Sequence, residues 1–211
     1  MREKYEAELQ KLNASIISMG RMIEIAIESS MLALMGRDVD AAREVAKNDE
    51  AINEMEREIE SLCLKLLLQQ QPVAADLRHI TAALKMITDM ERISDHAVDI
   101  ADLVLKVPDC KYGKMKEIAE MSDQIIQMLH EAVTSYIERD YSKARDVIVR
   151  DDVIDGLYRT IKRDLVEKIR QTDEGETILD YLLIAKYIER IGDHATVIAG
   201  WVIYALTGER I

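Results

Sequence analysis

The sequence predicts an all-α protein of six long helices, and two observations support this prediction. Apolar residues recur at steps of three and four, the spacing that gathers them on one face of a helix, and few segments alternate with the period of a strand. Only 2 of the 211 residues are proline and 8 are glycine, which leaves little turn material for an all-β fold. We expect helices at 3–36, 38–69, 72–106, 114–138, 140–170 and 176–206.

Residues at the expected helix ends support these boundaries. Gly36 can end the first helix and Asp38 can cap the second, because glycine suits a helix C-terminus and a carboxylate accepts free backbone N–H groups. Pro72 suits the first turn of the third helix, where its missing N–H is not needed. Asp140 can cap the fifth helix, and Gly175 lies in the turn before the sixth.

An internal repeat is the most informative feature of the sequence. The segment 91–97 (ERISDHA) returns 98 residues later as 189–195 (ERIGDHA), with six of seven positions identical. The block 49–53 returns 102 residues later as 151–155, with its first Asp and its Ile retained. Each copy therefore spans three of the expected helices, so the repeat indicates a duplicated structure.

The repeat predicts two tandem, duplicated three-helix bundles of the spectrin-like kind. We place the first at 1–107, a linker at 108–112 and the second at 113–211. Helices of about 30 residues are typical of bundles joined by short turns. The chain has no Phe, one Trp and eight Tyr but eleven Met, so the interior must be aliphatic. We expect two thin cores, one in each bundle, rather than one large core.

Each expected bundle carries two polar pairs at spacing i, i+4, which a helix places on one face about one turn apart. The pairs are Asp49 with Asn53, Glu91 with Asp95, Asp151 with Asp155, and Glu189 with Asp193. In an antiparallel hairpin, residues equidistant from the turn lie at one level. The midpoint of Asp49 and Glu91 falls at Gln70, and that of Asp151 and Glu189 falls at Arg170, both close to expected turns. Each bundle can therefore bring its two pairs together.

Carboxylates gathered in one patch attract cations. A single acidic pair is a weak signal in a chain with 40 acids, but these pairs sit at duplicated positions. Ligation by oxygen alone suits Mg, Ca, Mn or ferric iron, whereas zinc more usually recruits His or Cys. Asn53 offers a neutral carbonyl where the second repeat has Asp155, so we expect the two sites to differ in affinity or occupancy.

The histidines and cysteines carry weaker signals. His96 and His194 follow Asp95 and Asp193 directly, and neighbours on a helix point about 100° apart. We interpret both as structural or polar-face residues, with an outer-shell role as the alternative. Arg92 and Arg190 are expected to form ion pairs along their own helices, and Cys63 is expected in the core.

Two further histidines and the second cysteine complete this set. The sequence identifies no partner for His79 or His130. Cys63 and Cys110 form no CxxC pair, which favours a reduced, cytoplasmic setting.

Charge and missing motifs exclude several functions. The net charge of −12 argues against a nucleic-acid binder, because phosphate backbones attract clustered Lys and Arg. The N-terminus lacks an apolar signal core, and the longest apolar run, 195–206, is short of the ~20 residues that span a bilayer. Phosphate loops, GxSxG and HExxH are absent, and no His follows a Glu by three residues, which argues against a di-iron oxidase.

Together the doubled ERI(S/G)D block, the Asp-xx-Ile block and the segment 71–78 (QPVAADLR) resemble the PhoU family of phosphate-uptake regulators. The resemblance covers nearly the whole chain in the same order. It implies two similar three-helix bundles packed as a flat protein. It also implies that the four pairs bind metal at the surface: iron clusters, or other ions such as Zn, Mn, Mg, Ca or Ni. Asn53 departs from a strictly acidic pattern.

The resemblance further implies a regulatory role without catalysis. The protein would restrain phosphate import and starvation signalling through the ATPase subunit of a phosphate ABC transporter and, where one exists, a sensor histidine kinase. It would reach the membrane only through partners, and a homodimer is a further expectation. Three alternatives stay open: an accessory protein of a non-ABC phosphate permease, a metal-dependent phosphohydrolase, and a helical scaffold without metal.

Overall fold

The computed structural model describes residues 2–36, 38–69, 73–107 and 115–210. Six helices and no strand run through these residues, which confirms the all-α prediction. They are α1 (Arg2–Gly36), α2 (Val39–Gln69), α3 (Ala74–Lys106), α4 (Lys116–Glu138), α5 (Tyr141–Ile169) and α6 (Gly175–Thr207). The expected ends agree to within about two residues. Pro72, the Gln70 midpoint and the linker 108–112 lie outside the described residues.

Side chains at two helix starts act as the sequence predicts. Asp38 accepts the backbone N–H of Ala41 at 3.0 Å at the start of α2. Asp140 accepts that of Lys143 at 3.0 Å at the start of α5. These bonds satisfy donors that have no partner within the helix. Arg139, which ends α4, has a left-handed backbone with φ 57°.

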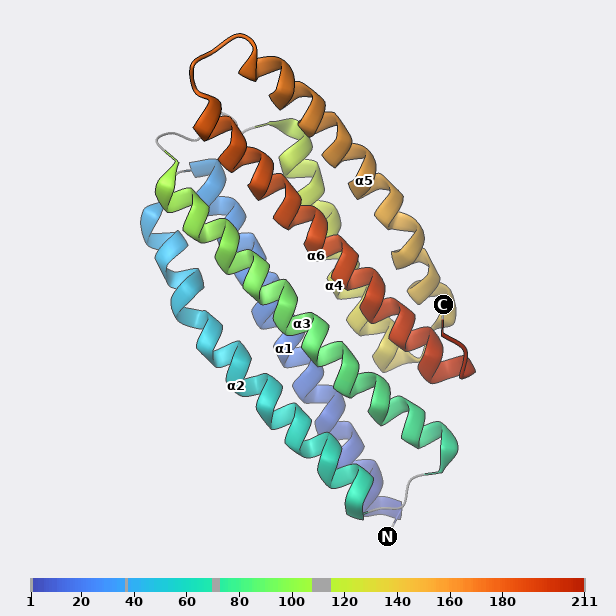
Figure 1. Cartoon of the computed structure of the whole chain (residues 1–211). Coiled ribbons are helices and arrows are strands. Elements are labelled where there is room, and N and C mark those ends of the chain that lie inside the picture. The colour runs from blue at the N-terminus through green and yellow to red at the C-terminus, as the bar shows by residue number, and fades with distance from the viewer. Residues whose placement is uncertain (1, 37, 70–72, 108–114, 211) are drawn as a thin grey trace.

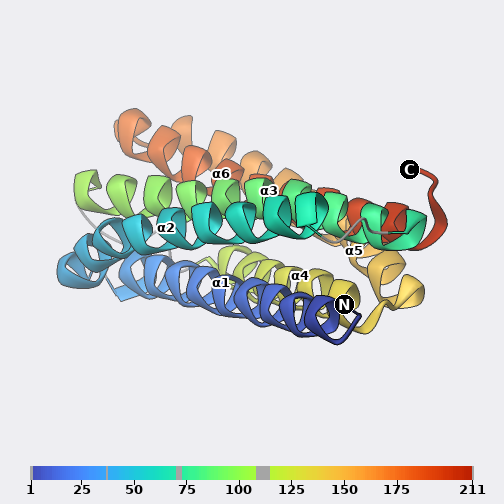
Figure 2. The ribbon, with the colours of Figure 1, turned by 90° about the horizontal axis from the view of Figure 1, so that it is seen from below.

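The helices form two layers (Figures 1 and 2). One layer holds α2, α3, α6 and α5 side by side in that order, and the other holds α1 beside α4. Helices α3 and α6 are central and antiparallel, because Arg78 near the start of α3 donates to the carbonyl of Ala205 near the end of α6, at 3.5 Å. The two three-helix units, α1–α3 and α4–α6, therefore meet along a broad contact.

The expectation of two thin cores is wrong, because the buried apolar residues of both units form one continuous cluster. Helices α3 and α6 bury adjacent residues, such as Ala82 with Ala83 and Ile184 with Ala185, which point in different directions. They can therefore pack against their own unit and against each other. The unit boundaries 1–107 and 113–211 stay a prediction.

Cys63 is buried in this cluster, and burial raises the pKa of its thiol to about 12. It is therefore a core residue, as predicted, and Cys110 lies outside the described residues. None of the described helices holds an apolar stretch long enough to cross a membrane.

Candidate functional site

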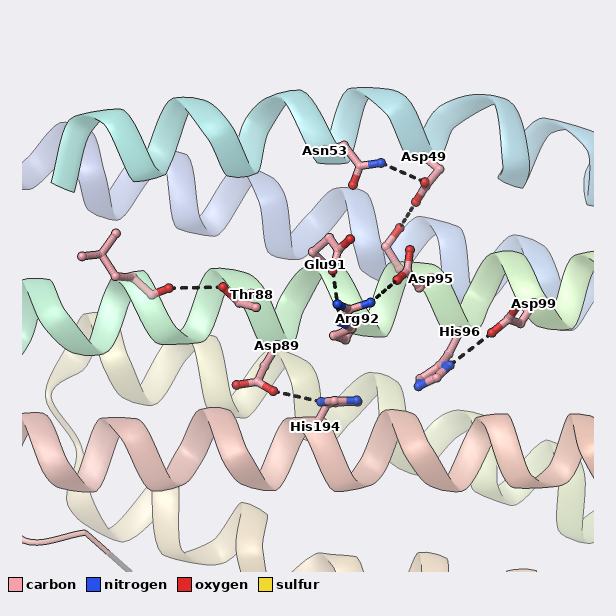
Figure 3. Close-up of polar contacts among 12 residues, drawn as sticks. Asp49, Asn53, Thr88, Asp89, Glu91, Arg92, Asp95, His96, Asp99 and His194 are labelled. Atoms are coloured by element: carbon pink, nitrogen blue, oxygen red, sulfur yellow. Dashed lines mark hydrogen bonds and ion pairs between the residues drawn. The ribbon is translucent and has the colours of Figure 1, made fainter. Parts of the chain in front are cut away.

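The contact between α2 and α3 brings the first repeat's pairs together (Figure 3). Asp49 and Asn53 project from α2 toward the face of α3 that carries Glu91 and Asp95. Ser94 of α3 donates its hydroxyl to Oδ1 of Asp49 at 2.7 Å. The Nδ2 of Asn53 donates to Oδ2 of Asp49 at 3.1 Å. Both oxygens of Asp49 thus already have protein donors.

The rest of this first site is acidic and half-buried. Burial raises the pKa of Glu91, and the charge of Asp95 raises it further, with smaller contributions from Glu56 and Asp49. Arg92 opposes this effect, since it lies 3.6 Å from Glu91 and 3.1 Å from Asp95. The contact of Arg92 with Asp95 agrees with the expectation that this arginine forms an ion pair along its own helix. Glu56 was missed, although its position seven residues after Asp49 places it on the same helix face.

The second repeat differs at the position that matches Ser94. Gly192 stands there and supplies no hydroxyl. A Cβ added to Gly192 would lie 3.2 Å from Oδ1 of Asp151, so this carboxylate packs directly against the α6 backbone. That oxygen is buried and accepts a hydrogen bond from none of the described residues. Oδ1 of Asp151 therefore lacks a donor among the described residues, whereas Oδ1 of Asp49 receives a hydrogen bond from Ser94.

Other acids surround this oxygen. Burial, together with the charges of Asp193, Asp155 and Glu189, raises the pKa of Asp151 from 3.8 to about 6. Glu189 is only 8% exposed and forms an ion pair with Lys186 on its own helix.

Asp155 has a protein cation beside it too. The guanidinium of Arg159 lies 3.4 Å from its Oδ2. Protein cations thus sit at two acids of the second site, while Oδ1 of Asp151 is left with a group of like charges.

The donors present fit a hard cation. Each site ends in one buried oxygen without a hydrogen bond among the described residues, Oδ1 of Asn53 in the first and Oδ1 of Asp151 in the second. Oxygen acceptors of this kind suit Mg, Ca, Mn or ferric iron. Within the described ranges, three or more His, Cys, Asp or Glu side chains do not converge closely enough to enclose an ion. Side-chain rotation would have to accompany binding.

Of the two roles predicted for His96 and His194, the structure agrees with the structural one and not with a place on a polar face. Both lie in the contact between α3 and α6, with side chains only 15% exposed. His194 is 2.9 Å from Asp89 across that contact, and His96 is 3.4 Å from Asp99 on its own helix. Burial lowers the pKa of His96.

The remaining histidines also have partners that the sequence did not reveal. His130 of α4 lies 3.1 Å from Glu24 of α1. His79 is buried and stacks on Tyr136, with ring centroids 4.1 Å apart. Burial lowers the pKa of His79 to about 4. Both contacts join α4 to the first unit.

Comparison with known proteins gives consistent matches over the whole chain. The family model described as the PhoU domain matches residues 16–104 and 118–202, one stretch in each unit. A protein of Clostridium acetobutylicum, named a phosphate-specific transport system accessory protein PhoU homolog, is 36% identical over 100% of this chain and 97% of its own. A protein of the same name from a Burkholderia species is 34% identical over 97% and 89%.

Two solved structures share the fold. The crystal structure of PhoU from Pseudomonas aeruginosa has a TM-score of 0.89 and 31% identity, covering 97% of this chain and all of that one. The structure of the phosphate transport system regulatory protein PhoU from Streptococcus pneumoniae has a TM-score of 0.92 and 26% identity, covering 98% and 99%. Likeness at this level extends over all six helices.

Proposed function

The chain belongs to the PhoU family, and on that premise we propose that it is a metal-binding regulatory adaptor of phosphate uptake. It restrains phosphate import and starvation signalling when phosphate is plentiful. Its partners are the ATPase subunit of a phosphate ABC transporter and, where one exists, a sensor histidine kinase. The names of full-length relatives, accessory proteins of the phosphate-specific transport system, support this role.

The metal part of the proposal rests on the buried Oδ1 of Asp151 among like charges. Asp151, Asp155, Glu189 and Asp193 would hold a cation in the second repeat, and Asp49, Asn53, Glu91 and Asp95 in the first. A bound cation supplies the positive charge that these oxygens lack. The protein contributes acids placed on neighbouring helices, so binding would tie α5 to α6 and α2 to α3.

The charge of the chain suits an adaptor rather than a nucleic-acid binder. At −12 the surface repels phosphate backbones and attracts basic protein surfaces. Bound cations would offset part of that charge at the two sites and so change the surface that a partner meets. We expect no catalytic turnover, a cytoplasmic location, membrane contact only through partners, and a homodimer as the assembled form.

Phosphate uptake in a deletion strain tests the regulatory role. Loss of the protein should raise phosphate uptake at high external phosphate, and the wild-type chain should restore the low rate. The double variant Asp151→Asn with Asp193→Asn should restore it poorly, although it folds. Asp173→Asn is the matched control, because it changes the charge of an exposed acid outside the pairs. Unchanged uptake in the deletion strain would contradict the regulatory role.

Co-purification identifies the partner. The wild-type chain should retain the ABC transporter's ATPase subunit at high phosphate and less of it at low phosphate. Retention of a non-ABC phosphate permease instead would replace the proposed partner and keep the accessory role. Turnover of simple phosphoesters that disappears in Glu91→Ala would favour the phosphohydrolase alternative.

A further inference from the structure

The two histidines of the doubled block face each other in the middle of the α3–α6 contact. Their ring centroids are 5.6 Å apart, and the ring planes are inclined by 35°. Side chains lean toward the N-terminus of their own helix, so on these antiparallel helices His96 and His194 lean in opposite directions, and their stagger brings the two rings together. Figure 3 shows one ring reaching from each helix into the space between them. Each repeat therefore contributes one imidazole to the same place.

The Nδ1 atom of each ring lies beside a carboxylate, on the side away from the other ring. Nδ1 of His194 is 2.9 Å from Oδ1 of Asp89, and Nδ1 of His96 is 3.4 Å from Oδ2 of Asp99. A neutral imidazole that donates from Nδ1 keeps a lone pair on Nε2. Tyr187 stacks on His96 with centroids 5.4 Å apart, which supports the ring's orientation. The carboxylates and the tyrosine thus set how both rings are presented.

The inner nitrogens lack partners. The Nε2 atoms of His96 and His194 are both buried, and neither forms a hydrogen bond within the described part of the chain. In Figure 3 these two nitrogens point toward each other. Buried polar atoms are normally paired, so two facing acceptors call for something between them that attracts both lone pairs. A single cation meets that requirement for both rings.

We propose that His96 and His194 bind one borderline transition-metal ion, of the Zn, Co, Ni or Cu(II) class, through their two Nε2 atoms. Imidazole is a preferred ligand of these ions. With metal–nitrogen bonds of about 2.1 Å, two imidazoles on one ion have centroids roughly 5–6 Å apart. The centroid separation of 5.6 Å falls within that range. Water completes the coordination.

The surroundings resemble those of known imidazole metal sites. A carboxylate behind each ligating histidine orients the ring and raises its basicity. Asp89 and Asp99 hold these positions. Arg190 lies near His96 and opposes a cation there, but the two carboxylates outweigh its single charge. Each side chain is 15% exposed although its Nε2 is buried, so entry of an ion from solvent requires a small movement of the rings.

This site is separate from the acidic pairs in both ligands and location. Its donors are nitrogens and not oxygens, and it joins α3 to α6 and not the helices of one unit. A bound ion would link the two repeats directly, so it would hold the contact between them. The histidine site therefore goes beyond the proposed function. Its test detects splitting from ligand nitrogens, which the oxygen ligands of the acidic pairs do not produce.

Electron paramagnetic resonance of Cu²⁺ tests the site in the untagged full chain, with excess Mg²⁺ present to occupy oxygen sites. We expect one bound Cu²⁺ whose spectrum shows splitting from two imidazole nitrogens. His96→Gln and His194→Gln should each remove the two-nitrogen signal and weaken Cu²⁺ binding at least tenfold. His130→Gln is the matched control, because its ring lies on α4, and it should change neither. Oxygen-only coordination in the wild type, or loss of signal in His130→Gln, would overturn the proposal.

A second measurement covers the case in which the Gln variants do not fold. Nitrogen resonances of the four histidines in wild-type protein can be followed as Zn²⁺ is added. One equivalent should shift the Nε2 signals of two histidines together and leave those of His79 and His130 unchanged. Shifts confined to His130, or to no histidine, would contradict the site.

Discussion

Ser94 of α3 donates its hydroxyl to Oδ1 of Asp49 on α2, at a distance of 2.7 Å. The matching position in the second repeat is Gly192, so Asp151 receives no such bond. The two repeats therefore place an equivalent aspartate on α2 and on α5, but the residue that faces it is Ser94 on α3 in the first repeat and Gly192 on α6 in the second. We expect the second site to depend more strongly on a cation, because its unsatisfied oxygen belongs to the carboxylate of Asp151, whereas that of the first site belongs to the neutral amide of Asn53.

The pKa of Asp151 predicts how pH changes the stability of the metal-free protein. Because burial and neighbouring acids raise it from 3.8 to about 6, the folded state holds a proton between these values and the unfolded state does not. Stability should therefore fall as pH rises through this window, and the loss is complete above about pH 6. Asp151→Asn should raise the free energy of unfolding at pH 7 by about 1 kcal/mol, after allowance for solvent screening.

Urea unfolding at pH 5 and pH 7 measures this effect. The difference between the two pH values should be smaller in Asp151→Asn than in the wild type. Asp173→Asn, at an exposed turn, should leave that difference unchanged. A variant at Asp151 that is less stable at pH 7, with an unaltered pH dependence, would show that the carboxylate is not strained by its neighbours.

Removal of the Ser94 hydroxyl should destabilise the first site. Ser94→Ala leaves Oδ1 of Asp49 without its donor in a half-buried position, at a cost of about 1–2 kcal/mol in metal-free protein. Added Mn²⁺ should recover part of this loss. Ser30→Ala is the control, since that buried hydroxyl donates only to Ile27 of its own helix. Equal effects of the two changes on thermal unfolding would argue against a special role for Ser94.

Addition of a hydroxyl at position 192 should satisfy the unpaired oxygen of Asp151 in the second site. Gly192→Ser brings a hydroxyl to Asp151, and Gly192→Ala brings only the Cβ, which lies 3.2 Å from Oδ1 in both variants. The contrast between them isolates the hydroxyl. We expect the serine variant to unfold at a higher temperature than the alanine variant without metal, and to bind Mn²⁺ more weakly. Identical behaviour of the two variants would mean that the hydroxyl does not reach the carboxylate.

Replacement of Lys186 should leave the buried carboxylate of Glu189 without a partner cation. This glutamate is 8% exposed and pairs with Lys186, so Lys186→Met leaves a buried carboxylate without its cation. We expect a loss of about 1–3 kcal/mol at pH 7, since the lysine is itself partly exposed. Tighter Mn²⁺ binding should accompany the loss. Lys162→Met, at an exposed position of α5, should change neither stability nor Mn²⁺ affinity.

Periodicity and repetition were enough to predict the helices and the faces that carry the acids. The spacing of Asp49 and Asn53, and their distance from the turn, depends only on helix geometry. The difference between Ser94 and Gly192 was visible as a mismatch in the repeat. The role of the hydroxyl could not be read from the repeat, because it depends on how α2 packs against α3 and so brings Ser94 to Asp49.

Contacts between the units could not be predicted from either repeat alone. The register of α3 against α6 determines two contacts of His194: its hydrogen bond with Asp89 and its ring contact with His96. That register results from packing in a shared core and not from local sequence. For the same reason, the repeat predicts two cores where the structure has one.

Mn²⁺ binding to metal-free protein tests the central claim most directly, with free Mn²⁺ followed by electron paramagnetic resonance. The wild type should bind Mn²⁺, and the double variant Asp151→Asn with Asp193→Asn should lose the tighter binding by at least tenfold. The matched first-repeat variant, Asp49→Asn with Asp95→Asn, should retain it. A wild type that binds no Mn²⁺ at millimolar concentration, or tighter binding that survives the second-repeat change, would contradict the account.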